Sequence, residues 1–415
     1  MSKIVIKNLG PIRDVALDLN KINVIMGPQS SGKSTIAKVI SFCTWLDKKC
    51  SRDGRPKPDE VKAYDYIHEM KTYHRLQGCF NRYTQIYFIG DFIEFCYNDC
   101  CPMTLDGAVS WYQDASFGSV KIKFGTKYAD PIDNNSKVIY IPAERNFVAA
   151  IYNLQEYLRD RDNIQDFVIG WYDAKRKYPE SNKLNILNLG VEYYATDQDV
   201  DVLHLRGGGD IALQTASSGL QSVVPLVTMF DYVTQGIYKE RRPMSVKERD
   251  ELVRKLNNLV EEDKKKNQHV DYSILRDVIN AKSYRYSQII VEEPEQNLFP
   301  DTQRELVYYM LQLCNDAERN HRLTITTHSP YILYALNSCM MGYLVKDNIP
   351  EQERQAFISK NAWVNPKLIS IWEIEDGKIR SIQDEDGIIS ENYFDLNMTA
   401  LMDEYYHMLS YYDEK

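Results

Sequence analysis

The sequence lacks the features that would assign it to a membrane, secreted or fibrous class. No apolar run approaches the roughly 20 residues needed to span a bilayer, and no signal peptide precedes the first apolar segment. The eight cysteines show no paired C-x-x-C spacing, which argues against a disulfide framework and suits a reducing cytosol. Internal repeats and low-complexity segments are also missing. We therefore expect a soluble, cytoplasmic, globular protein without membrane contact.

Positively charged residues are fewer than negatively charged ones. Lysine and arginine number 50 against 59 aspartate and glutamate, which gives a formal net charge of -9. Binding to nucleic acid would therefore need a local basic surface, and the acidic balance weighs against a dedicated DNA-binding protein. The basic runs Lys175-Arg176-Lys177 and Lys264-Lys265-Lys266 are most simply solvated helix faces, with DNA contact as the alternative.

The most informative stretch runs from Ile22 to Lys38. Its first five residues are an apolar strand, which leads into a match to G-x-x-x-x-G-K-[ST], and the spacing after Ser34 is helical. Small residues in such a loop let successive backbone N–H groups point at phosphate oxygens, and the following helix adds the positive end of its dipole. Lys33 is expected to reach the β- and γ-phosphates, and Ser34 to bind Mg²⁺. The residues predicted to hold ATP here are Gly27, Ser30, Ser31, Gly32, Lys33, Ser34 and Thr35.

A second apolar strand, Gln288–Val291, ends in the adjacent carboxylates Glu292 and Glu293. An α/β sheet presents ligands at the carboxyl ends of its strands. We therefore expect Glu292 to hold Mg²⁺, and Glu293 to orient and deprotonate an attacking water. A solvated acidic turn is the alternative, but the preceding apolar strand and the upstream phosphate loop favour the catalytic interpretation.

Two further segments complete the set. Ser217, Ser218 and Gly219 precede a helical run, so that a hydroxyl and free N–H groups gather at one point suited to an anion. His328 follows the strand Leu323–Thr327, where it can contact a γ-phosphate or the catalytic water. Taken alone, the first segment would be a simple helix N-cap and the second a structural histidine.

In this order the four segments resemble the Walker A, signature, Walker B and switch-histidine elements of ATP-binding-cassette (ABC) ATPases. Within that class the chain is similar to the soluble branch that contains SMC, RecF and overcoming-lysogenization-defect (OLD) proteins. The sequences of these segments are most similar to those of OLD-like AAA ATPases, several of which serve in bacterial anti-phage systems such as PARIS and Septu. The resemblance covers about residues 1–345 and rests on YIPAER at 140–145, SSGLQ at 217–221, EEPEQNLFP at 292–300 and THSPYIL at 327–333.

The resemblance implies a dimer in which ATP lies between the phosphate loop of one subunit and the signature of the other. Lys33 and Ser34 would then face Ser217 and Gly219 of a second chain. The loop that contains Asn297 and Leu298 would link the two sites.

The chain departs from the family pattern at several points. Glu292 replaces the usual aspartate before the catalytic glutamate, and the signature reads Ala-Ser-Ser-Gly rather than Leu-Ser-Gly-Gly. The separated acidic motifs of an OLD-type Toprim nuclease are not found, and Asp384-Glu385-Asp386 resembles a lone acidic turn more than a metal site. The glutamine that senses Mg²⁺ in the family is not identified, with Gln85 and Gln113 as candidates.

Alternating strands and helices around the phosphate loop predict an α/β fold. We expect an ABC-type ATPase head with a parallel-rich sheet, N-terminal antiparallel strands and an inserted helical lobe. The expected parts are the head, in residues 1–145 and 286–345, a helical lobe with the signature, 146–285, and a C-terminal hairpin and helix, 346–415. The first helix is expected to end near Lys48, where a charged stretch rich in Pro and Gly begins.

Cysteine and histidine offer a zinc site as a minor alternative. Cys96, Cys100 and Cys101 could bind the metal together with His68 or His74. The spacing is irregular, however, and buried reduced cysteines are the simpler interpretation.

Arg145 and the tyrosines have open interpretations. Arg145 either contacts phosphate or the dimer partner, or forms an ordinary salt bridge. The chain has 30 tyrosines, with a cluster at Tyr405, Tyr406, Tyr411 and Tyr412. We interpret these as the edges of amphipathic core elements, with protein interfaces as the alternative.

These observations predict an ATP- and Mg²⁺-dependent switch ATPase. Since no effector domain is recognised, we expect it to act through a separate effector protein, in anti-phage defence. The alternative is a DNA-repair or chromosome-maintenance ATPase of the RecF/SMC type that binds duplex DNA, and a transporter ATPase is a third, disfavoured option. An exposed tyrosine-rich patch would favour the effector, and a continuous basic surface would favour DNA.

Overall fold

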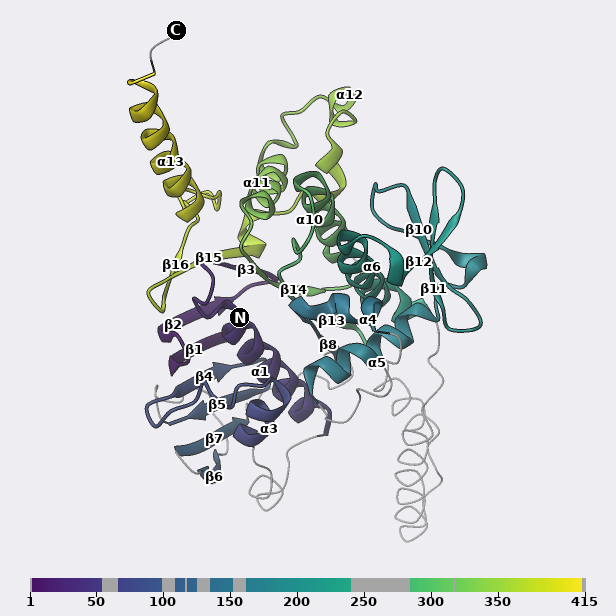
Figure 1. Ribbon diagram of the computed structural model, residues 1–415. Helices are drawn as coiled ribbons and strands as arrows, with labels where there is room; N and C mark the ends of the chain where they lie inside the picture. Colours follow the sequence, from purple (N-terminus) through teal and green to yellow (C-terminus); the bar gives the residue numbers. More distant parts are fainter. Residues whose placement is uncertain are drawn as a thin grey trace.

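The computed structural model describes residues 2–53, 66–98, 109–115, 118–124, 135–151, 162–239, 284–315 and 318–412. Within these ranges a large sheet with helices on both faces forms the body, and a small sheet lies to one side (Figure 1). The expected α/β class is confirmed.

The main sheet has 12 strands in the order β6-β7-β5-β4-β1-β2-β16-β15-β3-β14-β13-β8. The five strands from β15 to β8 pair in parallel, and the six from β6 to β2 pair antiparallel. The strands are β1 (Ser2–Leu9), β2 (Ile12–Leu19), β3 (Ile22–Met26), β4 (Gln85–Ile89), β5 (Ile93–Tyr97), β6 (Val109–Ala115), β7 (Gly118–Phe124), β8 (Ser136–Ile141), β13 (Tyr286–Glu292), β14 (Arg322–Thr327), β15 (Ile369–Glu375) and β16 (Lys378–Ser381).

Strand β3 shows how the sheet separates two cores. All five of its residues are buried, as expected for a strand that is covered on both faces. Ile22, Val24 and Met26 pack into one hydrophobic cluster, whereas Ile25 packs into the other, because successive side chains of a strand point to opposite faces. A continuous apolar run thus serves two cores.

The helices divide between the two faces. Helix α1 contributes Ile36, Val39 and Phe42 to the same core as Ile25, and α5, α6, α10 and α11 contribute to the opposite core. The α-helices are α1 (Lys33–Asp53), α3 (Tyr66–Tyr73), α4 (Phe147–Ala150), α5 (Asn163–Lys175), α6 (Ser218–Asp231), α7 (Ile237–Lys239), α10 (Pro300–Cys314), α11 (Pro330–Val345), α12 (Glu351–Arg354) and α13 (Tyr393–Leu409).

The expected helical lobe also contains a small sheet. Its four strands pair antiparallel and are β9 (Leu184–Asn185), β10 (Val191–Ala195), β11 (Asp201–Leu205) and β12 (Asp210–Ala212). Tyr193 and Leu203 of this sheet reach the core that α5 and α6 share, which fixes the lobe against the main sheet.

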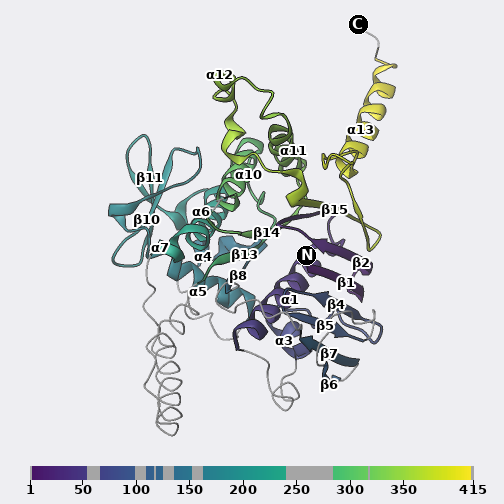
Figure 2. The same ribbon diagram turned by 180° about the vertical axis from the view of Figure 1, so that it is seen from behind.

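The C-terminal hairpin is part of the main sheet. Strand β15 pairs in parallel with β3 along the whole length of β3, from Ile369 opposite Ile22 to Glu373 opposite Met26. The tail therefore supplies the strand next to the one that leads into the phosphate loop. Helix α13 follows this hairpin and projects from the body, as both views show (Figures 1 and 2).

Helix α1 is longer than expected. It continues through Lys48 to Asp53, because Cys50 and Ser51 are still buried against the core. Tertiary packing thus overrides the local composition that predicted its end. Among the described residues, none of the helices combines the length and apolar character that crossing a bilayer requires.

Candidate nucleotide-binding site

The phosphate loop leaves the carboxyl end of β3 and turns into α1. Ser30 has φ +61°, Gly27 φ +150° and Gly32 φ +105°, so three loop residues leave the usual backbone regions. A Cβ on Gly27 would lie 2.8 Å from the carbonyl oxygen of Ile374, and one on Gly32 would lie 2.9 Å from Cγ1 of Ile12. Both glycines are therefore required by conformation and by close packing.

Lys33 is folded back onto this loop. Its Nζ donates to the carbonyl oxygens of Gly27 at 2.8 Å and Pro28 at 2.6 Å, and only 4% of the residue is exposed. Burial lowers the pKa of Lys33 to about 8, although the nearby charges of Glu293 and Glu295 oppose the shift. A buried ammonium that is held by carbonyl oxygens can exchange them for phosphate oxygens.

Glu292 is the last residue of β13, which lies between β14 and β8 in the parallel part of the sheet. It pairs in register with Thr326 of β14, which in turn pairs with Ile25 of β3, so its backbone lies two strand spacings, roughly 10 Å, from the end of β3. The residue is 3% exposed, and its Oε1 has no hydrogen-bond partner. Since a buried oxygen of this kind normally has a partner, it fits a ligand for Mg²⁺.

Glu293 and His328 meet across two neighbouring strand ends. Glu293 has φ +43°, and its backbone N–H donates to the carbonyl oxygen of Thr326. Its Oε1 lies 3.0 Å from Nε2 of His328, and this hydrogen bond is the main reason why the pKa of Glu293 is lowered. About 30% of the Glu293 side chain is exposed, so the carboxylate is accessible to a water molecule.

Glu295 supports the histidine from the other side. Its Oε1 accepts a hydrogen bond of 2.5 Å from the backbone N–H of His328. Burial raises the pKa of this carboxyl. The loop after β13 is therefore tied to the end of β14 at two points, one through Glu293 and one through Glu295.

Arg145 is buried beside the end of β13 and holds the backbone of Glu292 and Glu293 by hydrogen bonds. It is 0% exposed and donates to the carbonyl oxygens of Glu292 and Glu293, both at 2.8 Å, and to that of Ser222 at 3.1 Å. Burial lowers the pKa of Arg145 to about 10. Neither expected role matches this geometry, because the guanidinium is bound to backbone carbonyls inside the chain. It joins the signature helix to the strand that bears the carboxylates.

The signature segment begins α6. Ser217 is the N-cap, and its side chain accepts from the backbone N–H of Leu220. A Cβ on Gly219 would lie 2.9 Å from the carbonyl oxygen of Asn297, and the Asn297 side chain donates to Ser222 at 2.9 Å. The loop after β13 thus packs directly on the start of α6 within the same chain. Ser217 and Ser218 are exposed, and none of the described hydrogen bonds joins this segment to the phosphate loop of the same chain.

Several other candidates have ordinary structural environments. Lys175 is not on a solvated face as expected, since it is 3% exposed and pairs with Asp199 at 2.9 Å. Gln85 donates to the carbonyl of Asn98 in the antiparallel half of the sheet, away from β3. Asp384 accepts from backbone N–H groups in its own turn. The side chain of Gln113 and the run 264–266 lie outside the described residues.

The zinc alternative finds little support. Cys100 and Cys101 lie outside the described residues, and no group of three possible metal ligands occurs among the residues that are described. His74 packs between the rings of Tyr73 and Tyr140, and burial lowers its pKa to about 3. It is a core histidine.

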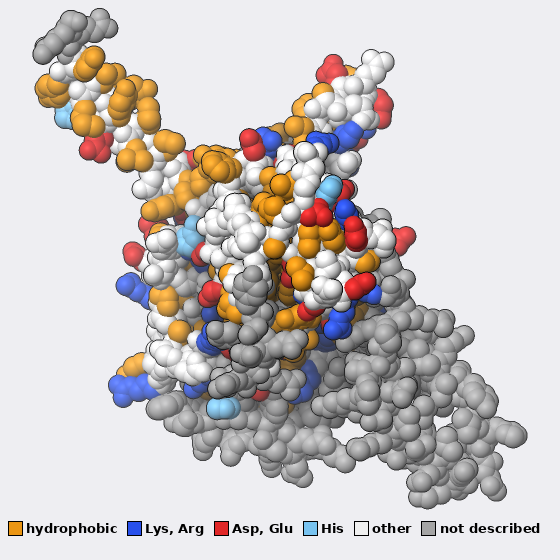
Figure 3. Space-filling model, turned by 45° about the vertical axis from the view of Figure 1, so that its right-hand side comes forward, with side chains coloured by type: hydrophobic (Ala, Val, Ile, Leu, Met, Phe, Trp, Pro, Cys, Tyr) orange, Lys and Arg blue, Asp and Glu red, His pale blue; other side chains and the backbone are white. Residues whose placement is uncertain are grey.

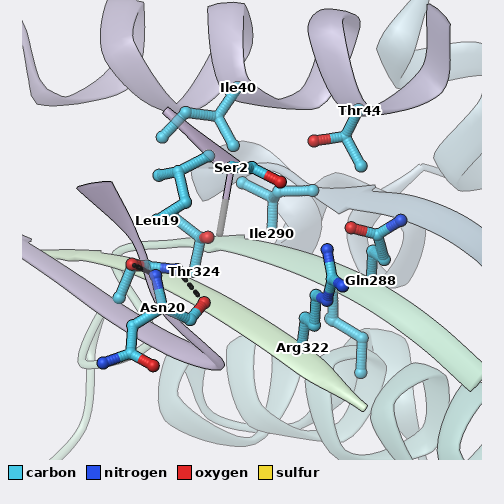
Figure 4. Close-up of a pocket in the computed structure, with 11 residues that line it drawn as sticks. Ser2, Leu19, Asn20, Ile40, Thr44, Gln288, Ile290, Arg322 and Thr324 are labelled. Atoms are coloured by element: carbon cyan, nitrogen blue, oxygen red, sulfur yellow. Dashed lines mark hydrogen bonds between the residues drawn. The ribbon is translucent and has the colours of Figure 1, made fainter. Parts of the chain in front are cut away.

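Two cavities lie at opposite ends of the parallel strands. A cavity of about 30 Å³ near Gln288 and Arg322, where β13 and β14 begin, has room for about one water molecule (Figure 4). A cavity of about 470 Å³ adjoins the phosphate loop at Ser30 and Ser31. Only the second has the size of a ligand site.

Comparison with known proteins identifies the family. Residues 3–305 match the model of the AAA domain family. Since the match spans most of the chain, the protein belongs to this family. No curated protein matches it.

Solved structures of ATPase domains align with the chain at low similarity. The SMC head domain from Thermotoga maritima is 10% identical over 92% of this chain and 98% of that one, with a TM-score of 0.36. The SMC head with an extended coiled coil bound to the C-terminal domain of ScpA, from Pyrococcus furiosus, is 10% identical over 97% and 99%, with a TM-score of 0.36. The recombination mediator RecF is 9% identical over 92% and 97%, with a TM-score of 0.31. At these TM-scores the likeness adds nothing to the fold described above.

Proposed function

We propose that this protein is an ABC-type ATPase that binds ATP with Mg²⁺, hydrolyses it, and uses the cycle as a conformational switch. The observation that carries the proposal is the convergence of three strand ends. The phosphate loop follows β3, His328 follows β14, and Glu293 follows β13, and these strands are adjacent in the sheet. Ser34 and Glu292 would hold Mg²⁺, which neutralises phosphate charge when bound.

The chemistry assigned to the chain is a proton transfer from water. Glu293 is kept ionised by its hydrogen bond to His328, so it can accept a proton as the water oxygen bonds to the γ-phosphorus. The bond from that phosphorus to the bridging oxygen breaks, and ADP and phosphate result. His328 holds the carboxylate in place, and Lys33 binds the phosphates.

Two copies would complete the site. The signature residues Ser217 and Ser218 are exposed and have no described contact with their own phosphate loop. This supports an ATP-sandwich dimer in which Ser217, Ser218 and Gly219 of the partner subunit close over the nucleotide. Binding and hydrolysis would then control association of the two heads.

The output of the switch is proposed to be a separate effector protein, in anti-phage defence. The supporting observation is α13, which exposes tyrosine, methionine and leucine side chains along its length (Figure 3). Tyr405, Tyr406, Tyr411 and Tyr412 are 53–77% exposed, so the expectation that they form core edges is wrong. Exposed apolar surface of this kind is typical of protein contact sites. DNA repair of the RecF/SMC type remains the alternative function.

The variant Glu293→Gln tests the proposed hydrolysis of ATP separately from its binding. It removes the base but keeps a side chain of the same size, so hydrolysis should fall by about 100-fold or more while ATP binding persists. Phosphate release and calorimetric binding measure the two effects. Glu353→Gln, on the exposed helix α12, is the matched control and should behave like wild type. Unchanged hydrolysis in Glu293→Gln would remove Glu293 from the mechanism.

The same variant distinguishes the two outputs. Glu293→Gln is purified from its native cells with Mg²⁺ and ATP, beside Lys33→Ala as the form that does not bind nucleotide. A second protein in fixed stoichiometry, present only in the first preparation, supports the effector. Nuclease-sensitive DNA without a protein partner supports the repair alternative and contradicts the effector.

A further inference from the structure

The cavity of about 470 Å³ beside the phosphate loop has walls from three distant parts of the sequence. One wall is the loop itself, a second is the turn between β1 and β2, and the third is the C-terminal hairpin with the first turn of α13. The loop contributes Ser30 and Ser31 to the lining, the hairpin contributes Glu373, Glu375, Asp376 and Arg380, and α13 contributes Tyr393 and Leu396. The tail of the chain thus borders the predicted phosphate site.

Size and lining fit the remainder of a nucleotide. Small-molecule pockets have volumes of about 300–1,000 Å³ and combine apolar surface with a few polar groups. Here Leu396 and the Tyr393 ring supply apolar surface, and Glu375 and Asp376 supply acceptors for hydroxyl groups. Because Ser30 and Ser31 lie in this wall, a group joined to phosphates in the loop would extend directly into the cavity.

The third wall, formed by the C-terminal hairpin and the first turn of α13, is attached to β3, the strand that leads into the phosphate loop. Glu373 pairs with Met26, the residue before Gly27. The carboxylate of Glu373 accepts a hydrogen bond of 2.8 Å from the backbone N–H of Tyr393 and forms an ion pair with Arg380. The start of α13 is therefore held in place by its backbone, and residue Tyr393 remains 39% exposed.

We infer that this cavity receives the ribose and base of the nucleotide, with Tyr393 as the aromatic side chain that contacts the base. The inference rests on the proposed ATP binding and assigns a specificity role to the C-terminal helix. A flat ring at a fixed helix end suits stacking, because every nucleobase presents an aromatic face. A bound base would then contact α13 directly.

The test separates the nucleoside from the phosphates. Affinities for ATP and for inorganic tripolyphosphate, both with Mg²⁺, are measured by calorimetry on the full chain. We expect Tyr393→Ala to weaken ATP binding about tenfold, the usual range for loss of one stacked base, and to leave tripolyphosphate binding unchanged. Tyr393→Phe keeps the ring and should bind ATP like wild type.

The matched control is Tyr405→Ala, which makes the same exchange on the same helix away from the cavity. It should leave ATP binding unchanged, which excludes a general effect on α13. Equal ATP affinity of wild type and Tyr393→Ala would overturn the inference while leaving the proposed function intact. An equal loss for ATP and tripolyphosphate would also overturn it. A wild-type protein that binds neither ligand would overturn both.

Discussion

Lys33 has a protonation state that ATP can change. Its pKa of about 8 reflects the burial of an ammonium whose hydrogen bonds go to neutral carbonyl groups. Phosphate oxygens favour the charged form, so ATP binding should raise this pKa. The lysine would then be partly neutral before binding and charged afterwards.

Binding at pH 8.5 should therefore take up protons. The measured enthalpy of ATP binding should change with the ionisation enthalpy of the buffer at pH 8.5 and much less at pH 6.5, where Lys33 is already charged. Lys33→Arg is the control, since arginine stays protonated across this range. An enthalpy that does not vary with buffer at pH 8.5 would contradict the low pKa.

Arg145 shows the limit of sequence reasoning at this scale. Its position after strand β8 suggests a role near the sheet end, but a one-residue pattern does not reveal that its partners are carbonyl oxygens. By contrast, residues 27–35 and the pair Glu292-Glu293 lie where their motifs predict, because the chemistry of a phosphate loop dictates local spacing. The roles of these residues stay predictions.

Replacement of Arg145 should be strongly destabilising. Arg145→Met fills similar volume but leaves the carbonyl groups of Glu292, Glu293 and Ser222 without their donor. We expect a loss of about 3 kcal/mol or more in the free energy of unfolding, measured by urea denaturation. Arg82→Met, which alters a solvent-facing arginine, should change it by less than about 0.5 kcal/mol.

At the scale of elements, α1 is tied to the antiparallel strands by one carboxylate. Asp47 accepts hydrogen bonds from the backbone N–H groups of Asp91, Phe92 and Ile93 at 2.9–3.1 Å. These groups lie at the turn between β4 and β5. The helix that begins at the phosphate loop is thus fixed, two turns before its last residue, to the far half of the sheet.

Asp47→Ala should lower the free energy of unfolding by about 3 kcal/mol, because the buried N–H groups of Phe92 and Ile93 and the partly buried N–H of Asp91 lose their acceptor. Burial raises the pKa of Asp47 to about 6, above its value in the unfolded chain. The folded state therefore holds this proton more tightly, and the stability from protonation is present below pH 4 and lost as pH rises to 6. Urea denaturation at pH 5 and pH 7 should show that the free energy of unfolding of wild type exceeds that of Asp47→Ala by more at pH 5 than at pH 7. Asp18→Ala, at an exposed position, is the control.

Most elements follow from apolar periodicity. The strands at the start of the chain, the two carboxylate- and histidine-bearing strands and the terminal hairpin occur where the sequence predicts them. The neighbour of each strand does not follow in the same way. The position of β15 beside β3 depends on packing between segments more than 340 residues apart in the chain, which local periodicity does not encode.

At the scale of the whole molecule, the signature should act between two chains. Glu293→Gln with ATP is expected to form a dimer, with about twice the mass of the 48.4 kDa monomer in light scattering. Ser217→Arg adds a bulky charge at an exposed cap and should prevent this dimer while ATP still binds. Gly219 is unsuitable for the test, because any side chain there would strain the fold.

Two controls define the result. Thr215→Arg alters an exposed residue just before the signature and should leave the dimer intact. A Ser217→Arg variant that dimerises as well as the parent would exclude the signature from the interface.

The position of β3 in the sheet also has a consequence for folding during synthesis. Its two neighbours β14 and β15 begin 300 and 347 residues later in the chain, counted from Ile22 to Arg322 and to Ile369, which is roughly 15–70 s at ordinary rates of elongation. Until then its five buried residues have no partner strand on either side. The nucleotide site therefore cannot assemble progressively on the ribosome, and a nascent chain that stalls before residue 322 would present an unpaired apolar strand to chaperones and proteases.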